Sequence, residues 1–266
     1  MSYEVAGHGE VPELGRGMRA LIDSGQPAFG GWCMIPSAFA AEVVSASGCD
    51  WLCIDQQHGL IDDAAMRLMV QAAAIRRTPT VVRVPWNEPG AIMRALDAGA
   101  DGIVVPMVNS QEEAERAAFA TRYPPGGYRS WGALRSGMAR SDFSPASGNA
   151  QCVCLVMIET ATAVDRLDAI LDVPGVDGVL VGPNDLAISH TGETTGAAKS
   201  QKDVEMILRI GEGCQKRGLA GAISAVDVAD AKRWAAAGFN LIGLPSDSAL
   251  LGEGLSRVLG TGRAAV

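Results

Sequence analysis

The chain alternates between short, strongly apolar runs and longer segments in which apolar residues recur at helical spacing. Eight apolar runs are evident, at residues 28–35, 47–55, 80–85, 98–106, 152–159, 174–183, 219–225 and 237–245. Each is short and continuous, as expected of a strand that is buried on both faces in a parallel sheet. The hydrophobic pattern therefore predicts eight buried strands separated by helices.

Four of these runs repeat one pattern, in which a glycine, one residue and then Asp or Asn precede the apolar stretch. They read "SGCDWLCID" (47–55), "AGADGIVVP" (98–106), "PGVDGVLVGP" (174–183) and "AGFNLIGLP" (237–245). Glycine is the residue that most often ends a helix, because it adopts the left-handed conformation without strain. The repeat predicts a helix that ends at the glycine, a tight turn and a buried strand.

Helix-start signals lie between the strands. They are Asp62 or Asp63, Pro89 in a first turn, the capping box Ser110 to Glu113, and Asp227. Eight alternations of strand and helix predict an α/β fold, a (β/α)8 TIM barrel that occupies residues 1–266 as one domain. A doubly wound open sheet is the alternative, but no G-x-G-x-x-G follows the first strand. Residues 123–149 are predicted to form a long irregular loop.

Composition and charge limit the partners. The net charge is −8, which argues against nucleic acid or an anionic membrane as a partner. The six cysteines form no C-x-x-C motif and are predicted to be reduced core residues. No apolar run approaches the ~18 residues of a membrane span, and residues 1–18 lack the apolar region of a signal peptide. These features predict a cytoplasmic protein.

Polar residues interrupt the pattern where strands end. They are Asp55, Gln57 and His58 after the second run, Arg83 in the third, Glu159 after the fifth, and Asn184 and Asp185 after the sixth. Each alone has a structural explanation, such as a solvated loop position, an ion pair for Arg83 or a helix N-cap for Asp185. Together they would meet at one rim of a barrel, where active sites of this fold lie.

The residue types indicate the chemistry. Two carboxylates among these residues, with no thiol or imidazole pair nearby, favour a hard divalent cation such as Mg²⁺ or Mn²⁺. Arg83 offers a planar double donor to an oxyanion, and His58, oriented by Asp55, could move a proton. The segment 182–185, Gly182, Pro183, Asn184 and Asp185, opens a helix whose N–H groups could hold a carboxylate.

Schiff-base chemistry would need a lysine inside the barrel. All lysines lie late in the chain and none closes a strand; they are Lys199, Lys202, Lys216 and Lys232. Carbanion chemistry at this rim should therefore depend on a metal.

Several motifs resemble the metal-dependent pyruvate aldolases of the HpcH/HpaI family, over roughly residues 27–250. They are "DWLCIDQQHG", "VVRVP", "GADGIVVPMV", "RYPPGGYRS", "VMIET" and "VDGVLVGPNDL". The resemblance implies a barrel whose last helix is exchanged with a neighbouring subunit, within a hexamer built as a trimer of dimers. It implies Glu159 and Asp185 as metal ligands and Arg83 at the keto or enolate oxygen. His58 would serve proton transfer, and Asp97 would reach a neighbour's histidine.

The implied reaction is cleavage or formation of 4-hydroxy-2-keto acids from an aldehyde and pyruvate or hydroxypyruvate. It would pass through an enolate and require Mg²⁺, Mn²⁺ or Co²⁺. The chain departs from the common family form at Gln57, where Glu is usual, and at Met157, where Gln is frequent, so the preferred donor stays open. Three alternatives remain. They are an oxaloacetate decarboxylase similar to macrophomate synthase, a CoA-ester lyase, and a barrel that binds a keto acid without catalysis.

Overall fold

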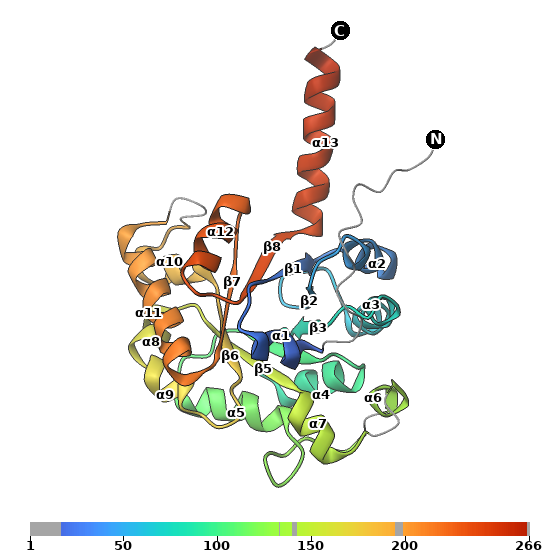
Figure 1. Ribbon diagram of the computed structural model, residues 1–266, viewed down its shortest axis with the longest axis vertical. Coiled ribbons are helices and arrows are strands. Elements are labelled where there is room, and N and C mark those ends of the chain that lie inside the picture. The colour runs from blue at the N-terminus through green and yellow to red at the C-terminus, as the bar shows by residue number, and fades with distance from the viewer. Residues whose placement is uncertain (1–16, 133, 140–142, 195–198, 265–266) are drawn as a thin grey trace.

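Eight parallel strands close into a barrel in the computed structural model (Figure 1), which describes residues 17–132, 134–139, 143–194 and 199–264. The strands are β1 (Ala28–Cys33), β2 (Trp51–Asp55), β3 (Thr80–Arg83), β4 (Gly102–Val105), β5 (Val153–Ile158), β6 (Gly178–Val181), β7 (Ala220–Ser224) and β8 (Leu241–Ser246). Each strand pairs with the next one along the chain, and β8 pairs with β1. The predicted (β/α)8 barrel is confirmed. Seven predicted runs contain their strands, and β8 extends one residue beyond the eighth run.

Helices surround the barrel, and the four with a predicted start signal begin there. In the described residues the helices are α1 (Met18–Ser24), α2 (Ala38–Ala46), α3 (Asp63–Ile75), α4 (Pro89–Asp97), α5 (Gln111–Thr121), α6 (Leu134–Ala139), α7 (Pro145–Gln151), α8 (Ala161–Asp165), α9 (Leu167–Leu171), α10 (Pro183–Thr191), α11 (Gln201–Arg217), α12 (Val228–Ala236) and α13 (Asp247–Ala264). Asp62 caps α3 by accepting the N–H of Ala65 at 2.8 Å, and Asp227 caps α12 in the same way. Ser110 caps α5, but the Glu113 carboxylate accepts the N–H of Asn109 rather than completing the predicted box.

The repeated glycine motif joins neighbouring strands at the N-terminal end of the barrel. Its glycines have positive φ: Gly48 (88°), Gly99 (98°), Gly175 (93°) and Gly238 (90°). The Asp or Asn two residues later accepts a backbone N–H from the preceding strand: Asp50 from Phe29 (2.7 Å), Asp101 from Thr80 (2.9 Å), Asp177 from Cys154 (2.7 Å) and Asn240 from Gly221 (3.0 Å). One motif therefore both ends a helix and fixes the register of a strand pair. The third copy differs, because Gly175 lies beyond the C-cap of α9 rather than directly after it.

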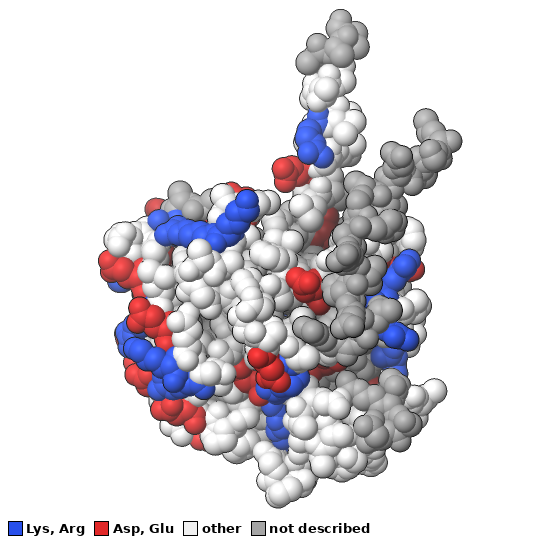
Figure 2. Space-filling view, viewed as in Figure 1, with Lys and Arg blue, Asp and Glu red and all other residues white. Residues whose placement is uncertain are grey.

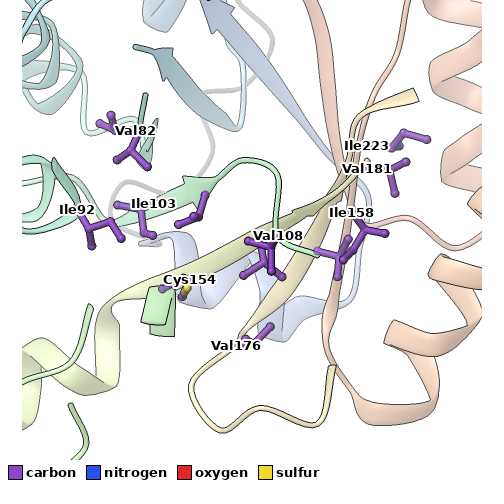
Figure 3. Packing of buried hydrophobic residues seen from close by; sticks show 14 of the residues in the cluster. Val82, Ile92, Ile103, Val108, Cys154, Ile158, Val176, Val181 and Ile223 are labelled. Atoms are coloured by element: carbon purple, nitrogen blue, oxygen red, sulfur yellow. The ribbon is translucent and has the colours of Figure 1, made fainter. Parts of the chain in front are cut away.

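Buried apolar side chains form two layers. One fills the barrel, where the indole of Trp51 occupies the space left by Gly30, whose added Cβ would collide with it. The other lies between strands and helices; Figure 3 shows part of it, with Val82, Ile92, Ile103, Val108, Cys154, Ile158, Val176, Val181 and Ile223 labelled. The six cysteines are all free, as predicted, and burial raises the pKa of thiols such as that of Cys53.

The segment predicted as one long loop contains two helices. Residues 123–149 include α6 and most of α7, and α7 begins at a capping box between Ser144 and Ser147. Tyr123 packs against Trp131 with ring centroids 5.2 Å apart. The prediction of an irregular loop is wrong there, because short helices without strong periodicity leave little signal in the hydrophobic pattern.

The last helix, α13, projects away from the barrel (Figure 1). Figure 2 shows charged side chains around the barrel and few on this helix. Its apolar side chains are exposed: Leu250, Leu251, Leu255, Val258 and Leu259. An isolated helix with exposed leucines gains little stability in water, so this shape agrees with the expected exchange between subunits, which stays a prediction. Among the described residues no helix is long and apolar enough to cross a membrane.

Candidate active site

The polar residues singled out in the sequence gather at the C-terminal ends of the strands. Asp55 is the last residue of β2 and lies opposite Arg83, the last residue of β3, in the strand register. Glu159 directly follows β5, and Asp185 lies in the first turn of α10, directly after β6. Because α10 begins at Pro183, Asp185 is inside the helix rather than at the N-cap position that its structural explanation required.

A buried ion pair forms the floor of this site. Arg83 Nε donates to Asp55 Oδ1 at 2.9 Å, and Arg83 Nη2 donates to Asp55 Oδ2. Trp32 Nε1 also donates to Asp55 Oδ2, at 3.1 Å. The Asp55 side chain is fully buried and that of Arg83 is 10 % exposed. A bidentate pair with these additional donors fixes the plane of the guanidinium.

Both members of the pair stay charged. Burial alone would raise the pKa of Asp55, but the hydrogen bonds and charge of Arg83, with Trp32, hold it below the usual range. Burial would lower the pKa of Arg83, and the contacts with Asp55 more than reverse that effect. A permanently charged guanidinium therefore lies at the bottom of the site.

One corner of this guanidinium is left for a ligand. Among the described residues, the hydrogen-bond partner of Arg83 Nη1 is a thioether, Met157 Sδ at 3.9 Å, and sulfur is a weak acceptor. The indole of Trp32 lies with its ring centroid 5.1 Å from Arg83 Cζ. The geometry thus offers a substrate oxygen one strong donor that the described protein groups do not occupy.

Glu159 is a buried carboxylate beside this donor. Its side chain is 2 % exposed, and Oε1 accepts the backbone N–H of Met107 at 2.7 Å. Burial raises the pKa of Glu159 to about 7, and the charge of Asp185 adds to this effect, while the Met107 N–H and Arg83 oppose it. Two carboxylates close enough to repel each other favour a cation between them.

The turn between β6 and α10 makes room for Glu159. A Cβ added at Gly182 would lie 2.5 Å from Glu159 Oε2 and 3.2 Å from Met157 Cε. Glycine here allows the carboxylate to face the rim with one oxygen uncommitted. Oxygen donors of this kind suit Mg²⁺ or Mn²⁺. The described residues contain no group of three or more His, Cys, Asp and Glu that could hold a metal ion.

His58 lies in the loop after β2 and is exposed. Asp55 Oδ1 accepts the backbone N–H groups of Gln57 (2.9 Å) and His58 (3.2 Å). The carboxylate thus fixes the backbone of this loop, and the expectation that it orients the imidazole directly is corrected. Gln57 Oε1 is buried and has no hydrogen-bond partner among the described residues.

Asp97 is not brought to this site within one chain. It ends α4, at the opposite end of the barrel, and pairs with Arg129 at 2.7 Å. Arg129 also lines a cavity of about 680 Å³, together with Thr80 and Asp101 at the N-terminal ends of strands. The cavity therefore lies away from the clustered strand-end residues. Any role of Asp97 in catalysis requires a second subunit.

Two residues of the site escaped the sequence analysis. Trp32 lies near the end of β1 and carries a polar N–H inside an apolar run, which is a weak signal of a buried polar partner. Met107 has φ of 56°, a left-handed backbone conformation that its residue type does not predict.

Comparison with known proteins identifies the relatives of this barrel. The model of the family described as "HpcH/HpaI aldolase/citrate lyase" matches residues 29–253. The chain belongs to this family. A "Hydroxypyruvate/pyruvate aldolase" of Roseovarius nubinhibens is 35% identical over 240 residues, 88% of this chain and 92% of the relative. A "4-hydroxy-2-oxo-heptane-1,7-dioate aldolase" of Salmonella arizonae is 35% identical over 239 residues, 88% of this chain and 89% of the relative.

Solved structures agree with this HpcH/HpaI assignment. A HpcH/HpaI aldolase/citrate lyase family protein from Burkholderia cenocepacia J2315 superposes with a TM-score of 0.85 at 33% identity, covering 92% of this chain and 98% of the other. Macrophomate synthase superposes with a TM-score of 0.86 at 26% identity, covering 100% and 98%. The resemblance expected from the motifs is confirmed over most of the chain.

Proposed function

We propose that this HpcH/HpaI protein is a divalent-metal-dependent aldolase. It cleaves or forms 4-hydroxy-2-keto acids, using pyruvate or hydroxypyruvate and an aldehyde, through an enolate. The observation that carries this proposal is the fixed Arg83 guanidinium beside the buried Glu159, whose Nη1 meets no strong acceptor among the described residues. The names of its relatives support the same chemistry.

The chain's own groups divide the work of binding. Glu159 and Asp185 would hold the cation, since they supply hard oxygen donors at an open rim. Members of the family are in general metal-dependent, which agrees with this donor set. The choice among Mg²⁺, Mn²⁺ and Co²⁺ belongs to the proposal. When bound, the cation supplies Lewis-acid stabilisation of the negative charge of the enolate.

Arg83 and the start of α10 orient the keto acid. Arg83 Nη1 donates to the keto oxygen, and this hydrogen bond strengthens as negative charge develops there. The N–H groups of Asn184 and Asp185, in the first turn of a nine-residue helix, are placed to receive a carboxylate. Pro183 lacks an N–H and fixes the backbone at the helix start, and Gly182 leaves space for Glu159.

His58 serves proton transfer at the rim, either directly or through a water molecule. Asp97 would assist from a neighbouring subunit, because its own barrel places it at the far end. This arrangement requires an oligomer, for which a hexamer with exchanged α13 helices is the expected form.

The first test needs no knowledge of the aldehyde. We expect the C3 protons of pyruvate to exchange with D₂O in the presence of Mg²⁺ or Mn²⁺, as followed by NMR, with hydroxypyruvate examined alongside. EDTA, Glu159→Ala and Arg83→Ala should each lower the rate by about 100-fold or more, because each removes stabilisation of the enolate.

Absence of exchange with either keto acid, with the cation demonstrably bound, would contradict the aldolase proposal. Oxaloacetate decarboxylation, as suggested by the likeness to macrophomate synthase, would then be assayed next, followed by CoA esters.

A further inference from the structure

The loop between β4 and α5 reaches over to Glu159 in an unfavourable backbone conformation. Met107 N–H donates to Glu159 Oε1 at 2.7 Å. To do so, Met107 adopts φ of 56°, in the left-handed region that few residues with a side chain occupy. Such a conformation is unfavourable and persists only where neighbouring groups hold it. The neighbours of Met107 therefore decide where the Glu159 carboxylate points.

Asn109 holds this loop from two sides. Its side-chain Nδ2 donates to the carbonyl oxygen of Met107 at 2.8 Å, and its backbone N–H donates to Glu113 Oε2 at 2.6 Å. Its Oδ1 accepts the hydroxyl proton of Thr160. Thr160 directly follows Glu159 in the chain. The two loops that meet at the rim are thus joined by side chains as well as by the Glu159 contact.

The direction of each hydrogen bond follows from the Met107 carbonyl, which can only accept. The Asn109 amide nitrogen must therefore face Met107, which leaves Oδ1 to accept the hydroxyl proton of Thr160. Thr160 Oγ1 also accepts the N–H of Ala163 at 3.0 Å, as the N-cap of α8. The bonds run in a closed ring from Thr160 to Asn109, to Met107, to Glu159 and back along the chain.

We propose that Asn109 and Thr160 are positioning residues that set the orientation of the Glu159 carboxylate for the cation. The proposal rests on the proposed function in taking Glu159 as a metal ligand. The ring engages Oε1 and leaves Oε2, which lies over Gly182, for the cation. A carboxylate held in its binding orientation loses less conformational freedom on binding, and partners of metal ligands typically affect affinity by about 10–100-fold.

The test measures Mn²⁺ affinity by electron paramagnetic resonance of the free ion, with no substrate present. Asn109→Ala and Thr160→Val should each weaken binding by about 10-fold or more, and the double variant should lose little beyond the stronger single effect, since both belong to one ring. Thr160→Ser keeps the hydroxyl and should restore the affinity. Gln111→Ala removes an exposed hydrogen bond two residues along and serves as the matched control.

A second readout follows the ring without any metal. In EDTA, amide hydrogen exchange at Met107 should be faster in Asn109→Ala than in the original chain. The reason is that the loop between β4 and α5 loses the hydrogen bond from Asn109 Nδ2 to the Met107 carbonyl. Unchanged exchange at Met107 would overturn the proposal, whatever the Mn²⁺ result.

Two affinity results also have distinct meanings. Weaker binding in Glu159→Ala, with unchanged binding in Asn109→Ala and Thr160→Val, would overturn the positioning role and leave the metal site intact. Unchanged binding in Glu159→Ala would overturn the metal site itself, and the positioning role with it.

Discussion

Glu159 is a single residue whose proposed role in binding a cation requires a charge that burial makes unfavourable. A carboxylate at 2 % exposure beside Asp185 is costly to ionise, and burial raises its pKa to about 7. Asp55 is buried as completely, yet its pKa stays low because Arg83 compensates its charge directly. The difference lies in the partner, and for Glu159 the proposed partner is a cation.

This difference predicts a pH dependence of the metal-free protein. The pKa of Glu159 in the folded state lies above its ordinary value, so the folded state binds this proton more tightly than the unfolded state does. The free energy of unfolding in EDTA should therefore fall as pH rises from about 4.5 through 7, by about 3 kcal/mol from this group. Denaturant titrations of Glu159→Gln against the original chain should show this loss only in the latter.

Excess Mg²⁺ or Mn²⁺ should cancel most of the loss, because the cation replaces the proton. The exposed Glu193→Gln variant is the control and should follow the original chain. An identical pH profile in Glu159→Gln would contradict the assignment of this titration.

At the scale of elements, the turn from β6 into α10 illustrates how a short motif builds a site. Gly182 follows the last residue of β6 and is the N-cap of α10. Pro183 is the first residue of the helix, and Asp185 lies in its first turn. Gly182 has φ of −98°, which any residue tolerates, so its glycine is required by space rather than by backbone conformation. The space that a side chain at 182 would fill is occupied by the carboxylate of Glu159, which follows β5.

Gly182→Ala should therefore damage the site more than the fold. The added Cβ would lie 2.5 Å from Glu159 Oε2, which must move, and we expect about a 10-fold to 100-fold loss of Mn²⁺ affinity. Circular dichroism should remain that of the original chain. Gly137→Ala in α6, where nothing lies within 4 Å of the added Cβ, is the matched control. Undiminished Mn²⁺ affinity in Gly182→Ala would show that Glu159 does not bind the cation from this position.

At the scale of the whole molecule, α13 is the feature that a single barrel leaves unexplained. Its base is anchored, because Asp247 Oδ1 accepts the N–H of Met34 at 2.9 Å, while the rest projects from the barrel (Figure 1). Leu251, Leu255 and Val258 follow helical spacing along one stripe. A stripe of this kind needs a partner surface, and the predicted exchange with a second copy would supply one.

Charged substitutions on this stripe should dissociate the assembly. Leu251→Glu combined with Leu255→Glu should lower the mass measured by sedimentation velocity. Activity should fall with the mass, since Asp97 is proposed to act on a neighbour's site, while Mn²⁺ binding by Glu159 and Asp185 should persist. Glu253→Gln on the same helix is the control. A double variant with unchanged mass would contradict the exchange of α13.

The sequence by itself determined the fold and most residues of the site. Eight buried runs, four of them preceded by a Gly-x-Asp or Gly-x-Asn turn, specify the barrel, because parallel strands need apolar faces and helices between them. Asp55, Arg83, Glu159 and Asp185 could be chosen because charged side chains interrupt or close these runs, and such positions share one rim in this fold. Helix starts were predictable because their capping side chains act locally, as Asp62 does.

Only the tertiary structure decided how these residues act on one another. Asp55 of β2 pairs with Arg83 of β3, and this contact decides which guanidinium nitrogen faces a ligand. The ring through Asn109 and Thr160 likewise joins two loops that are about 50 residues apart in the chain. The positive φ of Met107 is held by its contacts with Glu159 and Asn109, so the local sequence does not predict it. Asp97 was also assigned to the site from its motif alone. It is the last residue of α4, and that end of the helix lies at the end of the barrel opposite the clustered strand-end residues. Local composition fixes what each segment forms, whereas contacts between segments fix where each charge is held.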